Sequence, residues 1–287
     1  MLKLIAVILC SFPVSAVCQK GDAIDSFKRA VIEDEYKKKS FHFVTDVPGN
    51  IWQISKQPFK KNNLTGLIIT AGATALLIPL DQDITDELKK FSYRIKLYPQ
   101  TNYKVPLKLG DTKILKIPQN LNTAFYQLGE GGTSMLVAGG LFIYGKIKKD
   151  KQAINTAGDL TETFITMGVA TQIIKRISGR ESPFKATQPG GSWKPFPSLH
   201  NYQSNTSRYD AFPSGHLATM MATVTTLTLN YPKNKWIKPV GYTLMCVSSW
   251  AMINTEVHWI SDYPLALALG YVAAKITYKK NHPKKKY

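Results

Sequence analysis

The stretch Asp210-Ala211-Phe212-Pro213-Ser214-Gly215-His216 ends a long loop rich in Pro, Gly, Ser and Asn, and an uncharged run, Leu217–Tyr231, follows it. A run of this composition without alternation of polar and apolar residues predicts a helix. The first backbone N–H groups of a helix lack partners inside it, and the helix dipole favours negative charge there. Glycine permits close approach to the backbone, serine adds a hydroxyl, and histidine can carry a proton near neutral pH. The stretch therefore predicts an oxyanion-binding turn, although Pro, Ser and Gly also form purely structural turns.

Two further clusters flank this turn. Upstream, Lys175-Arg176-Ile177-Ser178-Gly179-Arg180-Glu181-Ser182-Pro183 ends a helical run that starts near Leu160. Downstream, His258-Trp259-Ile260-Ser261-Asp262 precedes another helical run. The chain between the second and third clusters is long enough for one helix to leave the site and a second to return. The three clusters can therefore meet at one place.

In order and content, the clusters resemble the three signatures of the type 2 phosphatidic acid phosphatase (PAP2) family, which is related to the class A acid phosphatases and the vanadium haloperoxidases. Those signatures are Lys-x6-Arg-Pro, Pro-Ser-Gly-His and Ser-Arg-x5-His-x3-Asp, and the resemblance covers residues 120–278. It implies an all-α bundle of roughly six helices and a phosphoric-ester hydrolase activity. We expect an N-terminal segment appended to this bundle.

The resemblance assigns catalytic roles to three side chains. It makes His258 the nucleophile that forms a phosphohistidine, Asp262 its orienting partner and His216 the general acid. On a helix, the four-residue spacing of His258 and Asp262 would put both on one face, where the carboxylate can accept an imidazole N–H and fix the tautomer. A lone pair with this spacing is also common on helix surfaces, but the flanking apolar runs favour burial here.

The phosphoryl oxygens are expected to be held by a lysine, the backbone of the turn and its hydroxyl: Lys175, Gly215 and Ser214. Two family arginines are missing, because Ser182 and Met252 stand at their positions. Neither residue can supply the bidentate, permanently charged contacts of a guanidinium. We expect a neighbouring cation to compensate, and Arg180 is the best placed in the sequence. The other candidates are Arg176, Lys185 and Arg208.

The N-terminus predicts export. Lys3 and the apolar stretch Leu4–Cys10 are followed by small residues around Ala16, which is typical of a cleaved signal peptide over residues 1–18. Val17 fits a lipoprotein signal poorly. A mature chain starting at Gln19 keeps one of the three cysteines, so no internal disulfide is expected. No Cys/His pair has zinc spacing, and we therefore expect neither a metal nor another cofactor.

The charge of the chain bears on its partners. A net charge of +18 often indicates a nucleic-acid partner, but an exported chain more readily meets anionic lipid headgroups or phosphorylated metabolites. We therefore expect a phosphorylated lipid or other phosphoester as substrate, with an anionic membrane surface as a further partner, and no nucleic acid. The expected location is periplasmic, either soluble or associated with a membrane. A solvated basic surface would also account for the tail, residues 279–287.

Six uncharged stretches predict the main helices. They are Leu64–Leu80, Gly131–Gly145, Thr163–Ile174, Ala211–Pro232, Pro239–Thr255 and Tyr263–Ala274. Most carry several polar residues, which favours buried core helices over membrane spans. A short amphipathic helix is expected near Asp25–Lys39. These stretches divide the chain into a signal peptide, an N-terminal helical and loop segment over residues 19–120, a phosphatase domain over residues 121–278 and the basic tail.

Two other functions stay open at this stage. A vanadate-dependent haloperoxidase would use vanadate, a phosphate analogue, as its cofactor, but the missing arginines weaken retention of a permanently bound anion. A non-catalytic protein could keep the fold and bind a phosphorylated headgroup. The loop Glu181–Phe212, which joins two of the clusters and carries several aromatic residues, is expected to cover the pocket and help choose the substrate.

Overall fold

The computed structural model describes residues 42–110 and 112–283. The predicted signal peptide, residues 1–18, and the predicted helix near Asp25–Lys39 lie outside the described residues. The last part of the basic tail, residues 284–287, lies outside them as well.

The uncharged stretches form helices, as predicted, and the all-α fold class is confirmed. The α-helices are α3 His42–Thr45, α4 Val47–Lys56, α5 Leu64–Leu77, α6 Asp81–Arg94, α7 Leu121–Leu128, α8 Gly131–Lys148, α9 Lys151–Ser178, α10 Leu199–Ser204, α11 Gly215–Asn230, α12 Ile237–Asn254 and α13 Tyr263–Asn281. Short 3-10 turns join several of them, among them η3 Ile78–Leu80 and η6 Ile260–Asp262.

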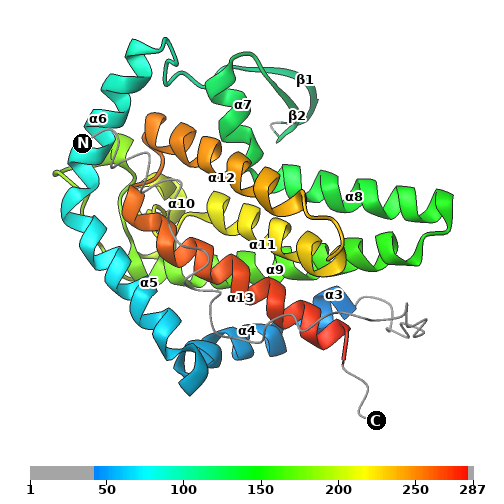
Figure 1. Ribbon diagram of the computed structural model, residues 1–287. Coiled ribbons are helices and arrows are strands. Elements are labelled where there is room, and N and C mark those ends of the chain that lie inside the picture. The colour runs from blue at the N-terminus through cyan, green and yellow to red at the C-terminus, as the bar shows by residue number, and fades with distance from the viewer. Residues whose placement is uncertain (1–41, 111, 284–287) are drawn as a thin grey trace.

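Helix α11 lies at the centre of the bundle and packs against α9, α12 and α13 (Figure 1). The hydrophobic core is continuous from this centre to the N-terminal helices, because Ile84 and Leu88 of α6 belong to the same cluster as Met221 of α11. Helices α11 and α13 approach very closely at Gly270. A Cβ atom there would lie 2.3 Å from the carbonyl oxygen of Ala218. Only glycine fits this contact.

Helix α9 is much longer than the uncharged stretch that predicted it. It begins at Lys151 instead of near Leu160 because two acidic residues in its first half are buried. Asp159 accepts hydrogen bonds from the side chains of Asn230 and Asn281, and Glu162 accepts one from Asn50. These bonds tie α9 to α4, α11 and α13. Carboxylates that accept hydrogen bonds from amide side chains inside a bundle do not mark a solvent-exposed loop.

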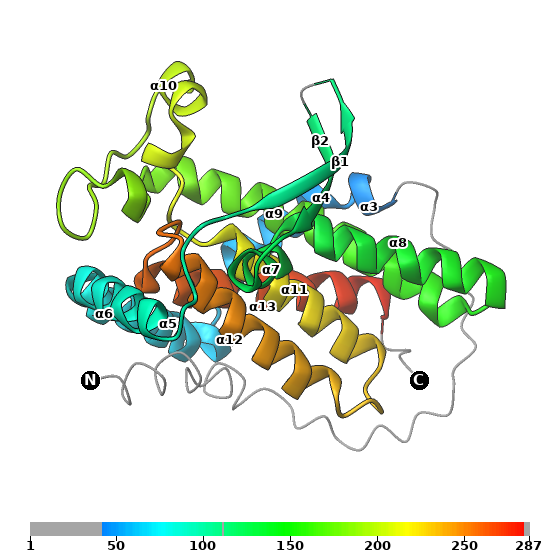
Figure 2. The ribbon, with the colours of Figure 1, turned by 90° about the horizontal axis from the view of Figure 1, so that it is seen from above.

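An antiparallel hairpin, β1 Tyr103–Leu109 and β2 Thr112–Pro118, was not predicted from the charged and aromatic sequence of this region. Tyr103 pairs with Pro118, and the register shifts between Lys104 and Leu107, next to a proline that has no N–H to donate. Figure 2 shows the hairpin projecting from the helices on the same side as α10.

Within the part of the chain that the structure describes, one helical stretch is long and apolar enough to cross a membrane by length and composition. It is Lys61–Arg94, which spans α5, η3 and α6, and the mean hydropathy of its most apolar window is 1.7. Only 11% of that window is buried inside the protein. The side chains of Leu64, Ile68 and Leu76 are exposed along α5.

The contact at Gly270 predicts a stability difference between two matched variants. Gly270→Ala should lower the free energy of unfolding by about 1–3 kcal/mol, because the new methyl group collides with a backbone carbonyl. Gly168→Ala in α9 is the control: a Cβ atom there meets nothing within 4 Å. The control should raise stability by up to about 1 kcal/mol through helix propensity. Equal denaturant midpoints for the two variants would contradict the packing described here.

Candidate active site

The turn before α11 is tied to the turn before α13. Ser214 is buried and caps α11, since its Oγ accepts the backbone N–H of Leu217 at 3.4 Å. The backbone N–H of Ser214 donates to the carbonyl oxygen of Asp262 at 3.1 Å. Gly215 is the first residue of the helix, and a Cβ atom there would lie 3.9 Å from Nζ of Lys175. The start of α11 and the end of α9 therefore meet, as the clusters in the sequence predict.

The two imidazoles lie side by side. His216 projects from the first turn of α11 and His258 from the segment between α12 and η6, and their ring centroids are 5.6 Å apart with planes at 73°. The ring of Tyr126 on α7 packs on the other side of His216, with 4.9 Å between centroids. The structure thus brings the two predicted catalytic histidines together.

The partner of His258 differs from the expectation. His258 lies outside any helix, so its spacing to Asp262 is bridged by a turn and not by one helix face. Its Nδ1 is 2.8 Å from the carbonyl oxygen of Ala211, which accepts the hydrogen bond, and 3.5 Å from Oδ2 of Asp262. The backbone carbonyl therefore fixes the tautomer, and the carboxylate acts on the ring through its charge. Nε2 keeps its lone pair and is the nitrogen able to attack a substrate.

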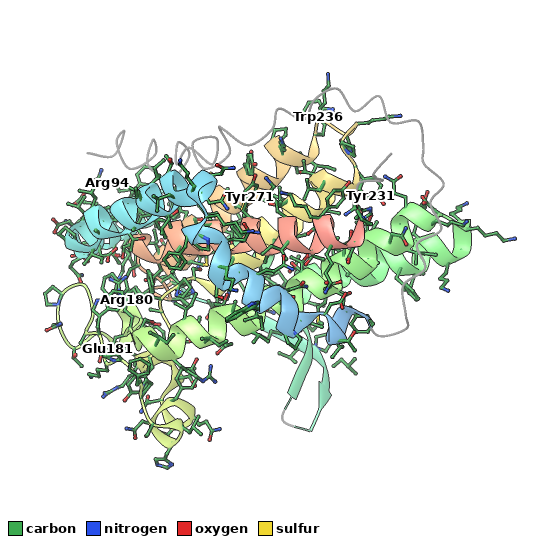
Figure 3. The ribbon with its side chains drawn as sticks, turned by 90° about the horizontal axis from the view of Figure 1, so that it is seen from below. Arg94, Arg180, Glu181, Tyr231, Trp236 and Tyr271 are labelled. Atoms are coloured by element: carbon green, nitrogen blue, oxygen red, sulfur yellow. The ribbon has the colours of Figure 1, made fainter. Side chains whose placement is uncertain are left out.

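Arg180 is buried and engaged by its neighbours. Its Nη1 donates to Oδ1 of Asp262 at 2.7 Å and to Oγ of Ser261 at 2.6 Å. Its Nη2 donates to Oδ2 of Asp81 at 2.5 Å and to the carbonyl oxygen of Gly190 at 3.0 Å. Figure 3 labels Arg180 beside Glu181, just beyond the end of α9. We call Asp81, Arg180, Ser261 and Asp262 the Arg180 cluster.

This arrangement bears on the expectation that Arg180 replaces a missing phosphate ligand. Both terminal nitrogens already hold internal partners, and only the Nε–H is without one among the described residues. A phosphate could not form a bidentate contact with the terminal nitrogens of Arg180 unless one of these ion pairs broke. The other candidates lie elsewhere: Arg176 binds Gln172 and stacks on Tyr202, and Arg208 is exposed.

Lys175 is the buried cation nearest to the turn. It lies in the last turn of α9, and its Nζ is 3.5 Å from Oδ2 of Asp210, a residue whose function the sequence did not reveal. At 3.5 Å the ion pair is loose, and Asp210 is partly exposed. Lys175 can therefore turn toward a bound anion without leaving the pocket.

The positions of the missing arginines are filled by packing. Met252 is fully buried, and its Sδ lies 3.7 Å from Oγ of Ser214, so the thioether occupies the space beside the turn. Ser182 is also buried, and its backbone N–H donates to the carbonyl oxygen of Ser207. Uncharged, buried side chains therefore occupy both positions.

A further cation comes from the hairpin. Nζ of Lys116 is 3.4 Å from Oε1 of Glu130, and the hydroxyl of Tyr103 donates to the same oxygen at 3.4 Å. Glu130 follows Gly129, where a Cβ atom would lie 2.9 Å from Cβ of His216. The base of the hairpin therefore lies close to His216, and its lysine adds positive charge there.

Burial governs the ionisation of the site. Burial lowers the pKa of His216 well below its usual value, and the charges of His258 and Lys175 add to the effect. Burial, followed by the charge of Lys175, lowers the pKa of His258 to about 3. Burial raises the pKa of Asp262 to about 6, against the opposing charge of Arg180. Both imidazoles are therefore neutral at pH 7 when the pocket holds no anion.

Sequence reasoning missed Asp81, Tyr126 and the carbonyl group of Ala211. Asp81 carried a faint signal, because a carboxylate directly after an apolar run has to find a partner if the helix packs. The other two carried none: a tyrosine and a backbone carbonyl are placed by tertiary structure alone. Among the described residues, no group of three or more His, Cys, Asp or Glu side chains is placed to hold a metal ion.

Comparison with known proteins finds a family resemblance over the C-terminal part of the chain. Residues 156–286 match the family model of the PAP2 superfamily. The lipid A 1-phosphatase of Porphyromonas gingivalis is 31% identical over 70 residues, which cover 24% of this chain and 16% of that protein. The match thus covers less than a fifth of the relative's length. No solved structure matches the chain at a significant level.

The shifted pKa values predict how stability depends on pH. Between pH 6.5 and 3 the unfolded chain binds a proton on His258 that the folded protein does not, so this residue makes stability fall as the pH falls. Asp262 acts in the opposite sense between pH 3.8 and 6, because its folded pKa is raised. The difference between wild type and a His258→Asn variant in how the free energy of unfolding changes with pH isolates the contribution of His258.

We expect wild type to lose more free energy of unfolding than His258→Asn when the pH drops from 7 to 4, measured by denaturant unfolding at each pH. A variant that loses as much as wild type over this interval would show that His258 is not buried in its neutral form.

Proposed function

We propose that this protein is an exported phosphatase that hydrolyses a phosphoester, with a lipid phosphate as the favoured substrate, through a phosphohistidine and without a metal ion. The observation that carries the proposal is the pair of imidazoles 5.6 Å apart, beside Lys175 and the start of α11. The match to the PAP2 superfamily supports a phosphatase activity.

In the proposed reaction, Nε2 of His258 attacks phosphorus and the bond to the leaving oxygen breaks. His216 donates its proton to that oxygen. A water molecule then attacks phosphorus of the phosphohistidine, its proton passes to His216, and the bond between phosphorus and Nε2 breaks, so that inorganic phosphate leaves and His258 is restored. His216 is neutral in the empty pocket, so the charge of a bound phosphate has to raise its pKa before it can act as the acid.

The oxyanions are held in this proposal by Lys175 and by backbone N–H groups at the start of α11. Ser214 already uses its hydroxyl to cap the helix, so its part is to shape the turn and add a second contact. The proposal needs no metal, because a histidine nucleophile, a histidine acid and a cationic pocket together supply what the reaction requires.

Three observations support a lipid as the substrate. Apolar side chains are exposed along α5 and on α8, where Leu136, Phe142 and Ile147 face outward. The chain carries a net charge of +18, which favours an anionic membrane surface. The name of the relative, lipid A 1-phosphatase, points to a phosphorylated lipid.

Turnover by the purified protein tests the proposal. Hydrolysis of p-nitrophenyl phosphate, phosphatidate, a prenyl diphosphate and a lipid A preparation is measured for wild type, His258→Ala and His200→Ala. His258→Ala should lose at least on the order of 1,000-fold in rate, because the nucleophile is gone. His200 lies in the loop expected to help choose the substrate, but its side chain is exposed on α10, so its replacement should leave the rate on the small substrate p-nitrophenyl phosphate unchanged.

The same panel distinguishes the alternatives. Turnover should persist in EDTA, and activity that is lost in EDTA and restored by added metal would contradict the proposed chemistry. Phosphate binding without turnover of any substrate would favour a binding protein. One observation favours a binding protein: Ser182 and Met252 stand where the family motifs have arginine. Vanadate-dependent oxidation of bromide would instead indicate a haloperoxidase.

A further inference from the structure

Asp81 is the one member of the Arg180 cluster that lies far outside the segment matched by the family, residues 156–286. It is the first residue of α6, directly after the apolar helix α5 and the turn η3. Its side chain is fully buried. An acidic residue at this place in an apolar helical stretch needs partners that repay the loss of solvation.

Both oxygens of Asp81 are used by residues of the site. Oδ2 accepts hydrogen bonds from Nη2 of Arg180 at 2.5 Å and from the hydroxyl of Ser261 at 2.6 Å. Oδ1 accepts the backbone N–H of Ser261 at 3.0 Å. The hydroxyl of Ser261 also accepts a bond from Nη1 of Arg180, so the three side chains form a closed ring.

This ring leads to the nucleophile in two steps. Nη1 of Arg180 holds Oδ1 of Asp262, and Oδ2 of Asp262 accepts the backbone N–H of Trp259 at 2.8 Å and lies 3.5 Å from Nδ1 of His258. Asp81 therefore fixes Ser261 directly and Asp262 through Arg180. Those two residues end η6, the turn that follows His258.

We propose that Asp81 is a positioning residue for the reaction, which rests on the proposed function above. It holds the turn from His258 to Asp262 in place, and it shares the charge of Arg180 so that this charge is not concentrated on Asp262. Without Asp81, the guanidinium keeps a single carboxylate partner and is drawn toward it. The negative charge of Asp262 then acts less on the imidazolium that develops at His258 during attack.

The test compares two variants that each remove one buried carboxylate charge. Asp81→Asn keeps the shape but turns an amide N–H toward either Arg180 or Ser261, both of which donate to Asp81. Asp159→Asn is the matched control, because Asp159 is similarly buried on α9 but contacts Asn230, Asn281 and His282 instead of His216 and His258. The kcat and KM for p-nitrophenyl phosphate and the unfolding midpoint are measured for both, with Asp81→Glu as the charge-preserving variant.

We expect Asp81→Asn to lower kcat on the order of 10–100-fold, as loss of an outer partner of a functional group does, with KM changed less than about threefold. Asp159→Asn should lose stability without this loss of kcat, and Asp81→Glu should recover part of the rate. Equal kcat values for wild type and Asp81→Asn would overturn the inference while leaving the proposed function intact. A wild type that hydrolyses no substrate would instead overturn the proposed function, and this inference with it.

If Asp81→Asn does not fold, Ser261→Ala decides the question. This variant removes the hydroxyl that bridges Asp81 and Arg180 but keeps both carboxylates and the guanidinium. A kcat reduced on the order of tenfold with unchanged KM would support positioning through the ring, and an unchanged kcat would overturn it.

Discussion

Arg180 is buried with two carboxylates, Asp81 and Asp262, that lie on segments far apart in the chain. A guanidinium and carboxylates taken out of water lose much solvation, and removing one partner from such a group typically costs about 3–5 kcal/mol. The cluster therefore joins the start of α6, the end of α9 and the turn before α13. The turn that carries His258 is built on this junction, and the turn at Ser214 bonds to it through the carbonyl oxygen of Asp262.

The same junction bears on the charge near the histidines. Met252 and Ser182 are buried and uncharged, while Arg180 is paired with two carboxylates and contributes little net charge to a ligand. The remaining charge at the histidines comes from Lys175, loosely paired with Asp210, from Lys116 of the hairpin and from the start of α11. Because both lysines are already paired with carboxylates, we expect the site to bind inorganic phosphate weakly and to depend on the rest of the substrate for affinity.

The sequence predicted the helices, the resemblance to the PAP2 superfamily and the meeting of the two histidines, because each of these depends on local composition or on motifs with fixed spacing. It mispredicted elements in which charged residues are satisfied by distant partners. The helical run expected to start near Leu160 left out the first part of α9, where Asp159 is buried, and the charged hairpin gave no strand pattern. The partner of His258 is a backbone carbonyl, which sequence cannot place. The role of Arg180 depends on Asp81, about a hundred residues away in the chain, and no local pattern reveals that contact.

In the mechanism that we propose, Nε2 of His258 attacks phosphorus while the carbonyl oxygen of Ala211 holds Nδ1. The most direct measurement is to quench the protein during turnover of a phosphoester under alkaline conditions, which preserve phosphohistidine, and to map the phosphorylated peptide by mass spectrometry. We predict an acid-labile phosphoryl group on His258 that forms and decays at rates consistent with turnover. Turnover with the phosphoryl group on another residue, or a His258→Ala variant that keeps the wild-type rate, would contradict the account.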